Sequence, residues 1–314
     1  MDIKAFIKNK KFKLFRKVGI SLVNRKIAVI GGDVRQLYLA KEFLKKGYTV
    51  TVFGIDMPRL DENDNLIYSK NLSEATENAF MAILPLPFSR DKTTLNAPSS
   101  TETILLSDIF TSCADIPYIA AGLPDTESKN KLSHKSLLID YATREDFTLK
   151  NALATVEGAL AIAIREMPIT LHGSVCAVTG YGRIGKILTR TLIALGADVK
   201  MFARKSIDRI SAQIDGAKVF DIKDISENIY DVDILINTVP SVIIEENVLR
   251  NFPKSSIIIE LASPPGGVDK HDAVTRGIRL VNAQSLPGKY SPKSAAKSIY
   301  DSIFSALYEK GVEI

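Results

Sequence analysis

The chain has 314 residues, of which 46% are hydrophobic and 25% are charged, and its formal net charge is +5. This length favours two domains over one, and the composition is ordinary for a soluble globular protein. Two cysteines, far apart in sequence, exclude a disulfide framework, and three histidines without spaced partners argue against a metal site.

The positive charge is concentrated at the N-terminus. The first 26 residues carry nine Lys or Arg and one Asp, a net charge of +8, so the remaining 288 residues carry about −3. The body of the protein therefore offers no broad basic face for nucleic acid. Residues 1–24 are predicted to be a basic, poorly ordered leader. Phe6, Phe12 and Phe15 among its lysines are typical of a surface-seeking amphipathic segment, but it lacks the continuous apolar stretch of a spanning helix. We interpret it as a solubilising extension rather than a membrane or partner anchor.

Two segments repeat the pattern of strand, glycine turn, helix and strand, at Lys26–Gly54 and Ser174–Arg204. Further strands are expected in each half of the chain. In the first half they are Ala79–Pro87, Thr101–Leu106, Pro117–Leu123 and Ser136–Tyr141, and in the second half Ala217–Phe220, Asp233–Pro240, Ser256–Leu261 and Ile278–Asn282. Strands that alternate with helices of this kind predict an α/β protein with two doubly wound parallel-sheet domains.

Two long helices are expected to join these domains. The first is Arg144–Met167, whose apolar residues form one predicted stripe: Leu149, Leu153, Val156, Leu160, Ile164 and Met167. The second closes the chain. The predicted organisation is an N-terminal α/β domain at residues 25–145, a Rossmann dinucleotide-binding domain at 146–290 that includes the connecting helix, and a C-terminal helix at 291–314 that packs back on the first domain.

The strongest motif is Gly180-Tyr181-Gly182-Arg183-Ile184-Gly185, which follows a predicted strand and opens a predicted helix. In this pattern the first glycine permits a tight turn, the second lets a diphosphate approach the backbone, and the third lets helix and strand pack closely. Free N–H groups and the helix dipole then favour the anion. The motif predicts a dinucleotide site, with a Rossmann domain that has lost its ligand as the alternative.

The end of the second strand of this domain bears on the choice of cofactor. An acid about 20 residues after the glycines usually binds the ribose 2′-OH of NAD. Here Ala203 takes that position, and Arg204 and Lys205 follow it. Because arginine matches a 2′-phosphate, the pattern favours NADP over NAD, although Arg204 stacking on adenine would suit either cofactor.

Two later loops are expected to line the nicotinamide side, because ligands of open α/β sheets bind outside the carboxyl ends of the strands. They are Asn237–Pro240 after the fourth strand and Glu260–Gly267 after the fifth. The residues expected to bind the cofactor are Thr238, Val239, Pro240, Leu261 and Ala262. Plain turn chemistry would also explain the Pro and Gly residues of these loops.

The first glycine pair differs from the fingerprint. Gly31 and Gly32 lack a third glycine and precede the charged residues Asp33 and Arg35. After another predicted strand come Ser89 and Arg90. Two arginines after separate strand ends predict an anion pocket on the substrate side, although each alone is typical of a solvated surface.

Taken together, these motifs resemble the family formed by the A subunits of dipicolinate synthase. The resemblance runs from about Arg25 to the C-terminus and rests on "KIAVIGGDVRQL", "NALATVEGALAIAI", "GSVCAVTGYGRIGK" with "MFARK", "DILINTVPS", "ELASPPGGVD" and "LPGKYSPKSAAK". The helix with "TVEGA" together with the "LPG…PK" segment is the distinctive combination. The basic leader lies outside the family pattern, and "PLPFSRD" matches it only loosely.

The resemblance implies oxidation of dihydrodipicolinate, from the lysine pathway, to dipicolinate during sporulation, with NADP as the acceptor. It also implies a flavoprotein-like partner, the B subunit of dipicolinate synthase, and a location in the mother-cell cytoplasm. The sequence does not determine the oligomeric state, and a homo-oligomer is one of the options.

Such a reaction needs cations for two substrate carboxylates and a group that accepts a proton. The candidate cations are Arg35, Arg90 and Lys289, and the candidate bases are Glu157 and Asp33. A structural acid is the alternative interpretation of Glu157. No metal site is expected.

Two other functions stay open at this point. One is an NAD(P)-dependent dehydrogenase of the 2-hydroxyacid or amino-acid type, which is disfavoured because the histidines show no recognisable acid or lysine pairing. The other is a nucleotide-binding subunit that positions a partner without doing chemistry.

Overall fold

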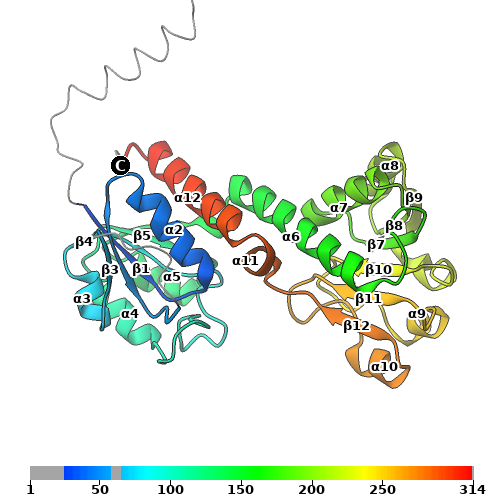
Figure 1. Cartoon of the computed structure of the whole chain (residues 1–314), viewed down its shortest axis with the longest axis horizontal. Helices are drawn as coiled ribbons and strands as arrows, with labels where there is room; N and C mark the ends of the chain where they lie inside the picture. The colour runs from blue at the N-terminus through cyan, green and yellow to red at the C-terminus, as the bar shows by residue number, and fades with distance from the viewer. Residues whose placement is uncertain (1–24, 58–64, 313–314) are drawn as a thin grey trace, which may run out of the picture. The chain divides into compact units, whose positions relative to one another are not determined.

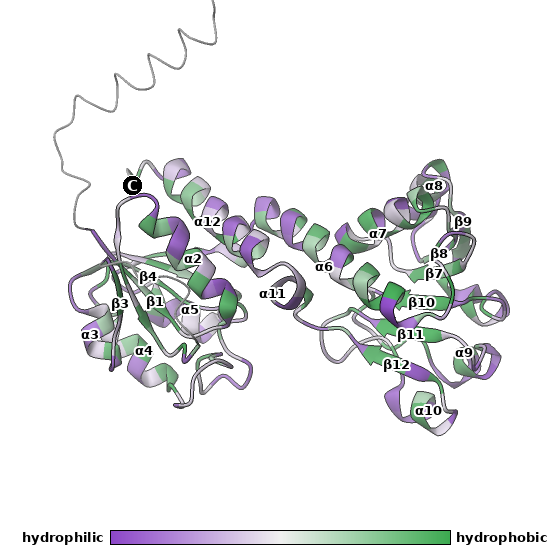
Figure 2. Cartoon of the chain, in the orientation of Figure 1, coloured by the Kyte–Doolittle hydropathy of each residue, from purple (hydrophilic) through white to green (hydrophobic). Residues whose placement is uncertain are grey.

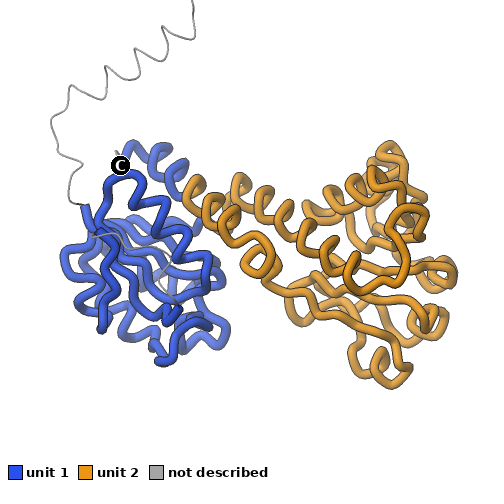
Figure 3. Tube along the Cα trace, viewed as in Figure 1, with its two compact units in different colours: residues 1–141, 303–314 blue, residues 142–302 orange. Residues whose placement is uncertain are grey.

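The computed structural model describes residues 25–57 and 65–312 (Figure 1). The predicted basic leader at 1–24 lies outside the described residues. The chain divides into two compact units, residues 1–141 with 303–314 and residues 142–302 (Figure 3). We refer to them as unit 1 and unit 2.

Unit 1 contains one six-stranded parallel sheet with the strand order β3-β2-β1-β4-β5-β6. Its strands are β1 (Lys26–Ile30), β2 (Thr49–Phe53), β3 (Leu66–Tyr68), β4 (Ala79–Ile83), β5 (Tyr118–Ala121) and β6 (Leu137–Asp140), and its helices are α2 (Val34–Leu44), α3 (Leu72–Thr76), α4 (Leu106–Ser112) and α5 (Thr126–Leu132). The order reverses between β1 and β4, which is the topological switch point of a doubly wound sheet.

Unit 2 repeats this topology in a second six-stranded parallel sheet, with the order β12-β11-β10-β7-β8-β9. Its strands are β7 (Val175–Thr179), β8 (Asp198–Ala203), β9 (Lys218–Asp221), β10 (Ile234–Asn237), β11 (Ile257–Glu260) and β12 (Arg279–Asn282). Its helices are α6 (Glu145–Glu166), α7 (Arg183–Ala194), α8 (Ser206–Ile214), α9 (Glu246–Asn251), α10 (Lys270–Thr275) and α11 (Leu286–Tyr290). The predicted fold class of two doubly wound parallel-sheet domains, the second a Rossmann domain, is confirmed.

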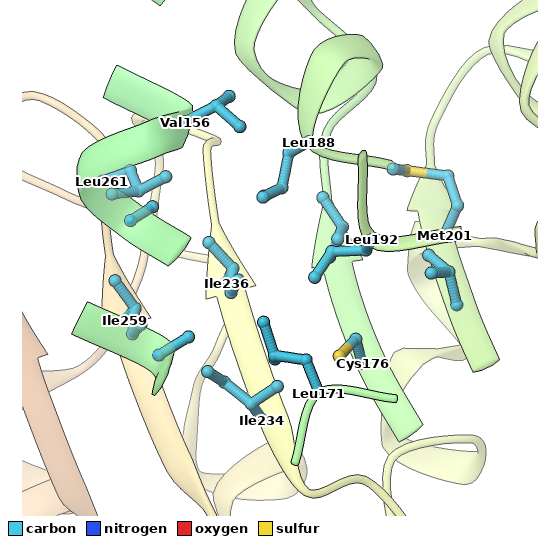
Figure 4. Packing of buried hydrophobic residues seen from close by; sticks show 14 of the residues in the cluster. Val156, Leu171, Cys176, Leu188, Leu192, Met201, Ile234, Ile236, Ile259 and Leu261 are labelled. Atoms are coloured by element: carbon cyan, nitrogen blue, oxygen red, sulfur yellow. The ribbon is translucent and has the colours of Figure 1, made fainter. Parts of the chain in front are cut away.

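Alternating residues of the unit 2 strands face two separate hydrophobic cores. Ile234 and Ile236 of β10 pack in the core beneath α6 and α7 (Figure 4), whereas Leu235 between them packs with α9 and α10 on the other face. Because both faces are covered, the first three residues of β10 and of β11 are all Ile or Leu (Figure 2).

The strand predictions hold for all six strands of unit 2 and for five of the six in unit 1. The strand expected at Thr101–Leu106 was wrong. Leu105 makes one isolated antiparallel bridge with Thr94, and α4 begins at Leu106. The sixth strand of unit 1 is instead the short edge strand β3, which was not predicted.

The apolar stripe predicted for α6 was also wrong in part. Val156 and Met167 are buried, but Leu149, Leu153 and Ile164 are 47–65% exposed. The buried face consists largely of small residues, among them Ala152, Ala159 and Ala163, because α7 and α11 pack directly against it. By length and composition α6 could span a membrane, and half of its most apolar stretch is buried inside the unit.

The first segment of unit 1 ends at Tyr141, four residues before the predicted boundary at 145, and unit 2 ends at Ser302, twelve residues after the predicted boundary at 290. Glu145 begins α6 and forms an ion pair with Arg183 of α7, which ties residues 142–145 to unit 2. The closing helix α12 (Pro292–Glu309) starts in unit 2, where Asp301 pairs with Lys150 of α6. Its last turns belong to unit 1, where the rings of Phe304 and Phe43 lie 5.9 Å apart.

Candidate functional site

The glycine turn of unit 2 joins β7 to α7 at the switch point of the sheet. Gly180 has φ +85°, and a Cβ there would lie 2.7 Å from Thr238 Oγ1 and 2.8 Å from Val239 Cγ2. A Cβ on Gly185 would lie 2.0 Å from the carbonyl oxygen of Gly180. The turn thus packs tightly against the start of the loop after β10, and only glycine fits at these two positions.

The N-terminus of α7 is left open for an anion. Gly182 is the N-cap, no side chain caps the helix, and its first turn contains no acidic residue. The backbone N–H groups of the first turn of a helix have no partner within the helix, and its dipole favours negative charge. A diphosphate group fits these requirements.

Two side chains of the glycine turn are engaged within unit 2. Tyr181 is 4% exposed, and its hydroxyl donates to the carboxylate of Asp215 at the end of α8. Burial, together with Asp215, raises the pKa of that hydroxyl. Arg183 is exposed and donates through Nε and Nη2 to both oxygens of Glu145, at 2.5–3.0 Å. At position 181, therefore, the backbone rather than the side chain is available to a ligand.

Three cations follow the end of β8, where no acid is present. Arg209 of α8 donates through Nη1 to the carbonyl oxygens of Ala203 and Arg204 and to Asp221 Oδ2, at 2.8–2.9 Å, so its charge is used within the chain. The side chains of Arg204 and Lys205 are exposed and form no hydrogen bond or ion pair within residues 25–57 and 65–312. Where an adenosine ribose is bound in such domains, the strand end therefore presents two cations without a side-chain partner among the described residues, and the neighbouring Asp221 carboxylate is paired with Arg209.

The loops predicted to line the nicotinamide side begin at a buried polar network. Thr179, Asn237 and Glu260 end β7, β10 and β11 and are all 1% exposed or less. Thr179 Oγ1 donates to Asn237 Oδ1 at 2.5 Å, and Asn237 Nδ2 donates to Glu260 Oε1 at 2.7 Å. Sequence reasoning placed Asn237 and Glu260 at the start of the two loops but did not single out Thr179 or connect the three side chains, because nothing in a single sequence shows that three strand ends are neighbours.

In unit 1, Asp33 and Arg35 form an ion pair at the carboxyl end of β1. Asp33 caps α2, and its carboxylate accepts from Arg35 Nε and Nη2 at 2.8 Å, while Nη2 also donates to the carbonyl oxygen of Leu86 at 2.9 Å. Burial alone would raise the pKa of Asp33, but the hydrogen bonds and charge of Arg35 outweigh it and hold that pKa below its ordinary value. Arg35 is 8% exposed, and Asp33 already neutralises part of its positive charge.

The segment after β4 covers the first glycine turn. A Cβ on Gly31 would lie 2.6 Å from Leu95 Cδ2, and the backbone N–H of Gly32 donates to the carbonyl oxygen of Asn96 at 3.0 Å. Arg90, in the same segment, is exposed and donates to Asn96 Oδ1 at 3.1 Å. Its positive charge contributes to lowering the pKa of Asp33.

Gln36, next to Arg35 on α2, is a residue that the sequence motifs did not single out. It is 3% exposed, and neither its amide nitrogen nor its amide oxygen has a hydrogen-bond partner in the part of the chain that the structure describes. Buried amides are rarely left unpaired, since each such group costs about 1–3 kcal/mol.

The remaining candidates, Glu157 and Lys289, lie in unit 2. Glu157 is exposed on α6, and Lys289 is exposed on α11, a helix that packs against α6. In unit 1 the structure thus pairs Asp33 with Arg35, and it places Arg90 on the segment that covers the first glycine turn. Among the described residues, no three His, Cys, Asp or Glu side chains are grouped as metal ligands would be.

Two sequence profiles match the chain, one in each unit. Residues 26–142 match the profile of the N-terminal domain of the dipicolinate synthase A subunit. Residues 153–293 match that of the S-adenosyl-L-homocysteine hydrolase NAD-binding domain. Unit 2 is thus a nicotinamide-dinucleotide-binding domain of the dehydrogenase kind.

Individual proteins of the dipicolinate synthase A family are similar to this chain over nearly its whole length. The dipicolinate synthase A subunit of Bacillus subtilis (strain 168) is 32% identical over 291 residues, which cover 92% of this chain and 97% of the relative. The crystal structure of the dipicolinate synthase A chain from Bacillus subtilis covers 92% of this chain and 97% of its own, with 32% identity and a TM-score of 0.79. That of the A subunit from Bacillus halodurans covers 91% of this chain and 98% of its own, with 29% identity and a TM-score of 0.81.

Proposed function

We propose that this chain, which belongs to the family of dipicolinate synthase A subunits, oxidises dihydrodipicolinate to dipicolinate with NADP as the hydride acceptor. The observation that carries the proposal is the open N-terminus of α7 behind the glycine turn, followed at the end of β8 by Arg204 and Lys205 without an acid. An oxidoreductase with a nicotinamide cofactor needs such a diphosphate site.

On the cofactor side, each group has a defined task. The first turn of α7 binds the diphosphate through backbone N–H groups, and Gly185 lets α7 approach the Gly180 carbonyl closely enough to form the turn. Arg204 and Lys205 bind the 2′-phosphate, which an acid at Ala203 would repel. The bound nicotinamide accepts the hydride, and this is the chemistry that the protein itself cannot supply.

On the substrate side, the dicarboxylate is held by cations. Aromatisation of the dihydro ring transfers one hydride to the nicotinamide and releases one proton, so the balanced products are dipicolinate, the reduced cofactor and H⁺. We assign carboxylate binding to Arg35, Arg90 and Lys289. Because Asp33 already accepts from Arg35, the pair has little net charge, and we expect Arg90 and Lys289 to contribute most of the attraction.

For the proton, we favour Glu157 over Asp33. The hydrogen bonds from Arg35 stabilise the ionised form of Asp33, and a carboxylate with a lowered pKa is a weak proton acceptor. The side chain of Glu157 is exposed and forms no hydrogen bond or ion pair with another described residue. A flavoprotein-like partner, the B subunit of dipicolinate synthase, and a location in the mother-cell cytoplasm follow from the family resemblance and belong to the same proposal.

The experiment that tests this function mixes the purified chain with NADP and dihydrodipicolinate, with and without the B subunit. We expect formation of reduced cofactor and dipicolinate in equal amounts. If dihydrodipicolinate is not consumed even with the B subunit present, the chain is a nucleotide-binding protein that does not catalyse the reaction. Turnover of a 2-hydroxyacid or an amino acid by the chain alone would instead support the general dehydrogenase.

A further inference from the structure

The network of Thr179, Asn237 and Glu260 lies at the carboxyl edge of the unit 2 sheet. In the sheet register, Asn237 of β10 is paired with Thr179 of β7 on one side and with Glu260 of β11 on the other. The three side chains therefore run as a row across the switch point, from the strand of the glycine turn to the strand that precedes the last cofactor loop.

The same network holds the backbone of two loops. Asn237 Oδ1 accepts from the backbone N–H of Val239 at 3.0 Å, and Asn237 Nδ2 donates to the carbonyl oxygen of Val239 at 3.0 Å. Glu260 Oε1 accepts from the backbone N–H of Ala262 at 2.9 Å, and Oε2 accepts from that of Gly267 at 2.8 Å. One buried carboxyl group thus fixes the loop after β11 at both ends and, through Asn237, the loop after β10.

Gly267 packs tightly against this network. A Cβ on Gly267 would lie 2.4 Å from Asn237 Nδ2 and 2.5 Å from the carbonyl oxygen of Val239. A carboxyl group that is 1% exposed is costly unless every oxygen is hydrogen-bonded, and here three donors converge on it. The geometry is therefore specific for a side chain with two acceptor oxygens.

We infer that Glu260 is a positioning residue for the cofactor: it holds the loops at 238–240 and 261–267 in the arrangement that binds the nicotinamide-ribose half. This inference rests on the nucleotide site of the proposed function. Glu260 acts through the two loops and does not itself contact the cofactor, because its side chain is buried and accepts its hydrogen bonds from Asn237, Ala262 and Gly267. It has no part in binding the adenosine half, which lies on the side of β8.

The decisive variant is Glu260→Gln, which keeps the size of the side chain but replaces one acceptor oxygen by a donor that faces a backbone N–H or Asn237 Nδ2. The control is Asp233→Asn. Asp233 also accepts from a backbone N–H, that of Val175 at 2.8 Å, but at the opposite, amino edge of the sheet. Both variants make the same chemical change, and only one touches the loops.

The experiment titrates each full-length protein with NADP and with adenosine 2′,5′-bisphosphate, which carries the adenosine half alone. We expect Glu260→Gln to weaken NADP binding by about tenfold or more, since one buried hydrogen bond to a charged group is replaced by a clash, and to leave affinity for the fragment within about twofold. Asp233→Asn should leave both affinities unchanged, even if its melting temperature falls.

Equal loss of both ligands in Glu260→Gln, or no loss of either, would overturn the inference. Should Glu260→Gln not fold, the second variant is Thr179→Val, which removes only the hydroxyl that donates to Asn237. It should weaken the binding of NADP, but not that of the fragment, by about threefold. An unchanged NADP affinity in Thr179→Val would then overturn the inference. If the unaltered protein binds neither ligand, the proposed function fails, and this outcome is distinct from the others.

Discussion

Gly158 of α6 and Leu286 of α11 are in direct contact. A Cβ on Gly158 would lie 2.8 Å from Leu286 Cβ and 3.2 Å from Tyr290 Cδ2. Gly158 belongs to the "TVEGA" segment and Leu286 opens the "LPG" segment, the two motifs whose combination is distinctive in the sequence. Their occurrence together has a physical basis, because the missing side chain on α6 makes room for α11.

Gly158→Ala should destabilise unit 2. Alanine in a helix is ordinarily favoured over glycine by about 1 kcal/mol, but overpacking a buried contact costs about 1–3 kcal/mol. We expect a net fall in the free energy of unfolding of about 1 kcal/mol, measured by urea unfolding. A rise in the free energy of unfolding is the result expected for a helical glycine without packing contacts. It would show that α11 does not pack against Gly158 as described.

The strand pattern and the glycine turn of unit 2 could be predicted from the sequence, because both depend on local signals. Buried parallel strands are continuous apolar runs, and the run from Gly180 to Gly185 has a spacing that few other structures need. The signal is weak where a strand is short and at an edge. Leu66–Tyr68 has only three residues, and Thr101–Leu106 looks like a strand although Ile104 is buried against Gly54 rather than paired in the sheet.

The candidate site was less predictable than the fold, because a side chain's partners depend on tertiary structure. Asp33 and Arg35 were assigned as separate polar groups, and the structure shows that they bind each other. Glu260 appeared in the sequence only as the first letter of a loop motif. Its three donors come from residues 237, 262 and 267, and the register that brings Asn237 to it cannot be deduced from one sequence.

The double variant Arg204→Ala, Lys205→Ala tests whether these two side chains bind the 2′-phosphate of NADP. Removing two cations from the end of β8 should weaken NADP binding by about tenfold or more, because hydrogen bonds to a charged group contribute about 1.5–3 kcal/mol each. Binding of NAD should change by about twofold at most. Equilibrium titration with both cofactors measures the ratio, and Lys218→Ala, an exposed lysine paired with Asp198, is the control. An unchanged ratio would rule out these two residues as the 2′-phosphate site.

Asp33→Asn tests the ion pair with Arg35 through its pH dependence. The pKa of Asp33 is lower in the folded protein than in the unfolded chain, so the ionised carboxylate stabilises unit 1 above the unfolded pKa of about 4. That stabilisation is lost as the pH falls through the folded pKa. The variant should therefore be less stable at neutral pH, and the difference from the unaltered protein should shrink below about pH 4.

Urea unfolding at a series of pH values measures this difference. Asp115→Asn is the control, because its side chain is 86% exposed and forms only a surface pair with Lys135. A gap between Asp33→Asn and the unaltered protein that stays constant down to strongly acidic pH would contradict the pairing.

Gln36→Met tests the unpaired amide on α2. Methionine has a similar length and no polar atom, so the variant removes two buried groups that lack protein partners among the described residues. We expect the free energy of unfolding to rise by about 1 kcal/mol. A clear loss of stability, by thermal unfolding, would mean that the amide is satisfied in the native protein.

The measurement that tests the central claim most directly is equilibrium titration of the folded protein with NADP, NADPH and NAD, alongside Gly185→Ala. The account predicts saturable binding with a preference for the phosphorylated cofactor. It predicts loss of that binding in Gly185→Ala, in which the added Cβ would lie 2.0 Å from the Gly180 carbonyl oxygen. A folded protein with no affinity for any pyridine nucleotide, with or without the B subunit, would contradict it.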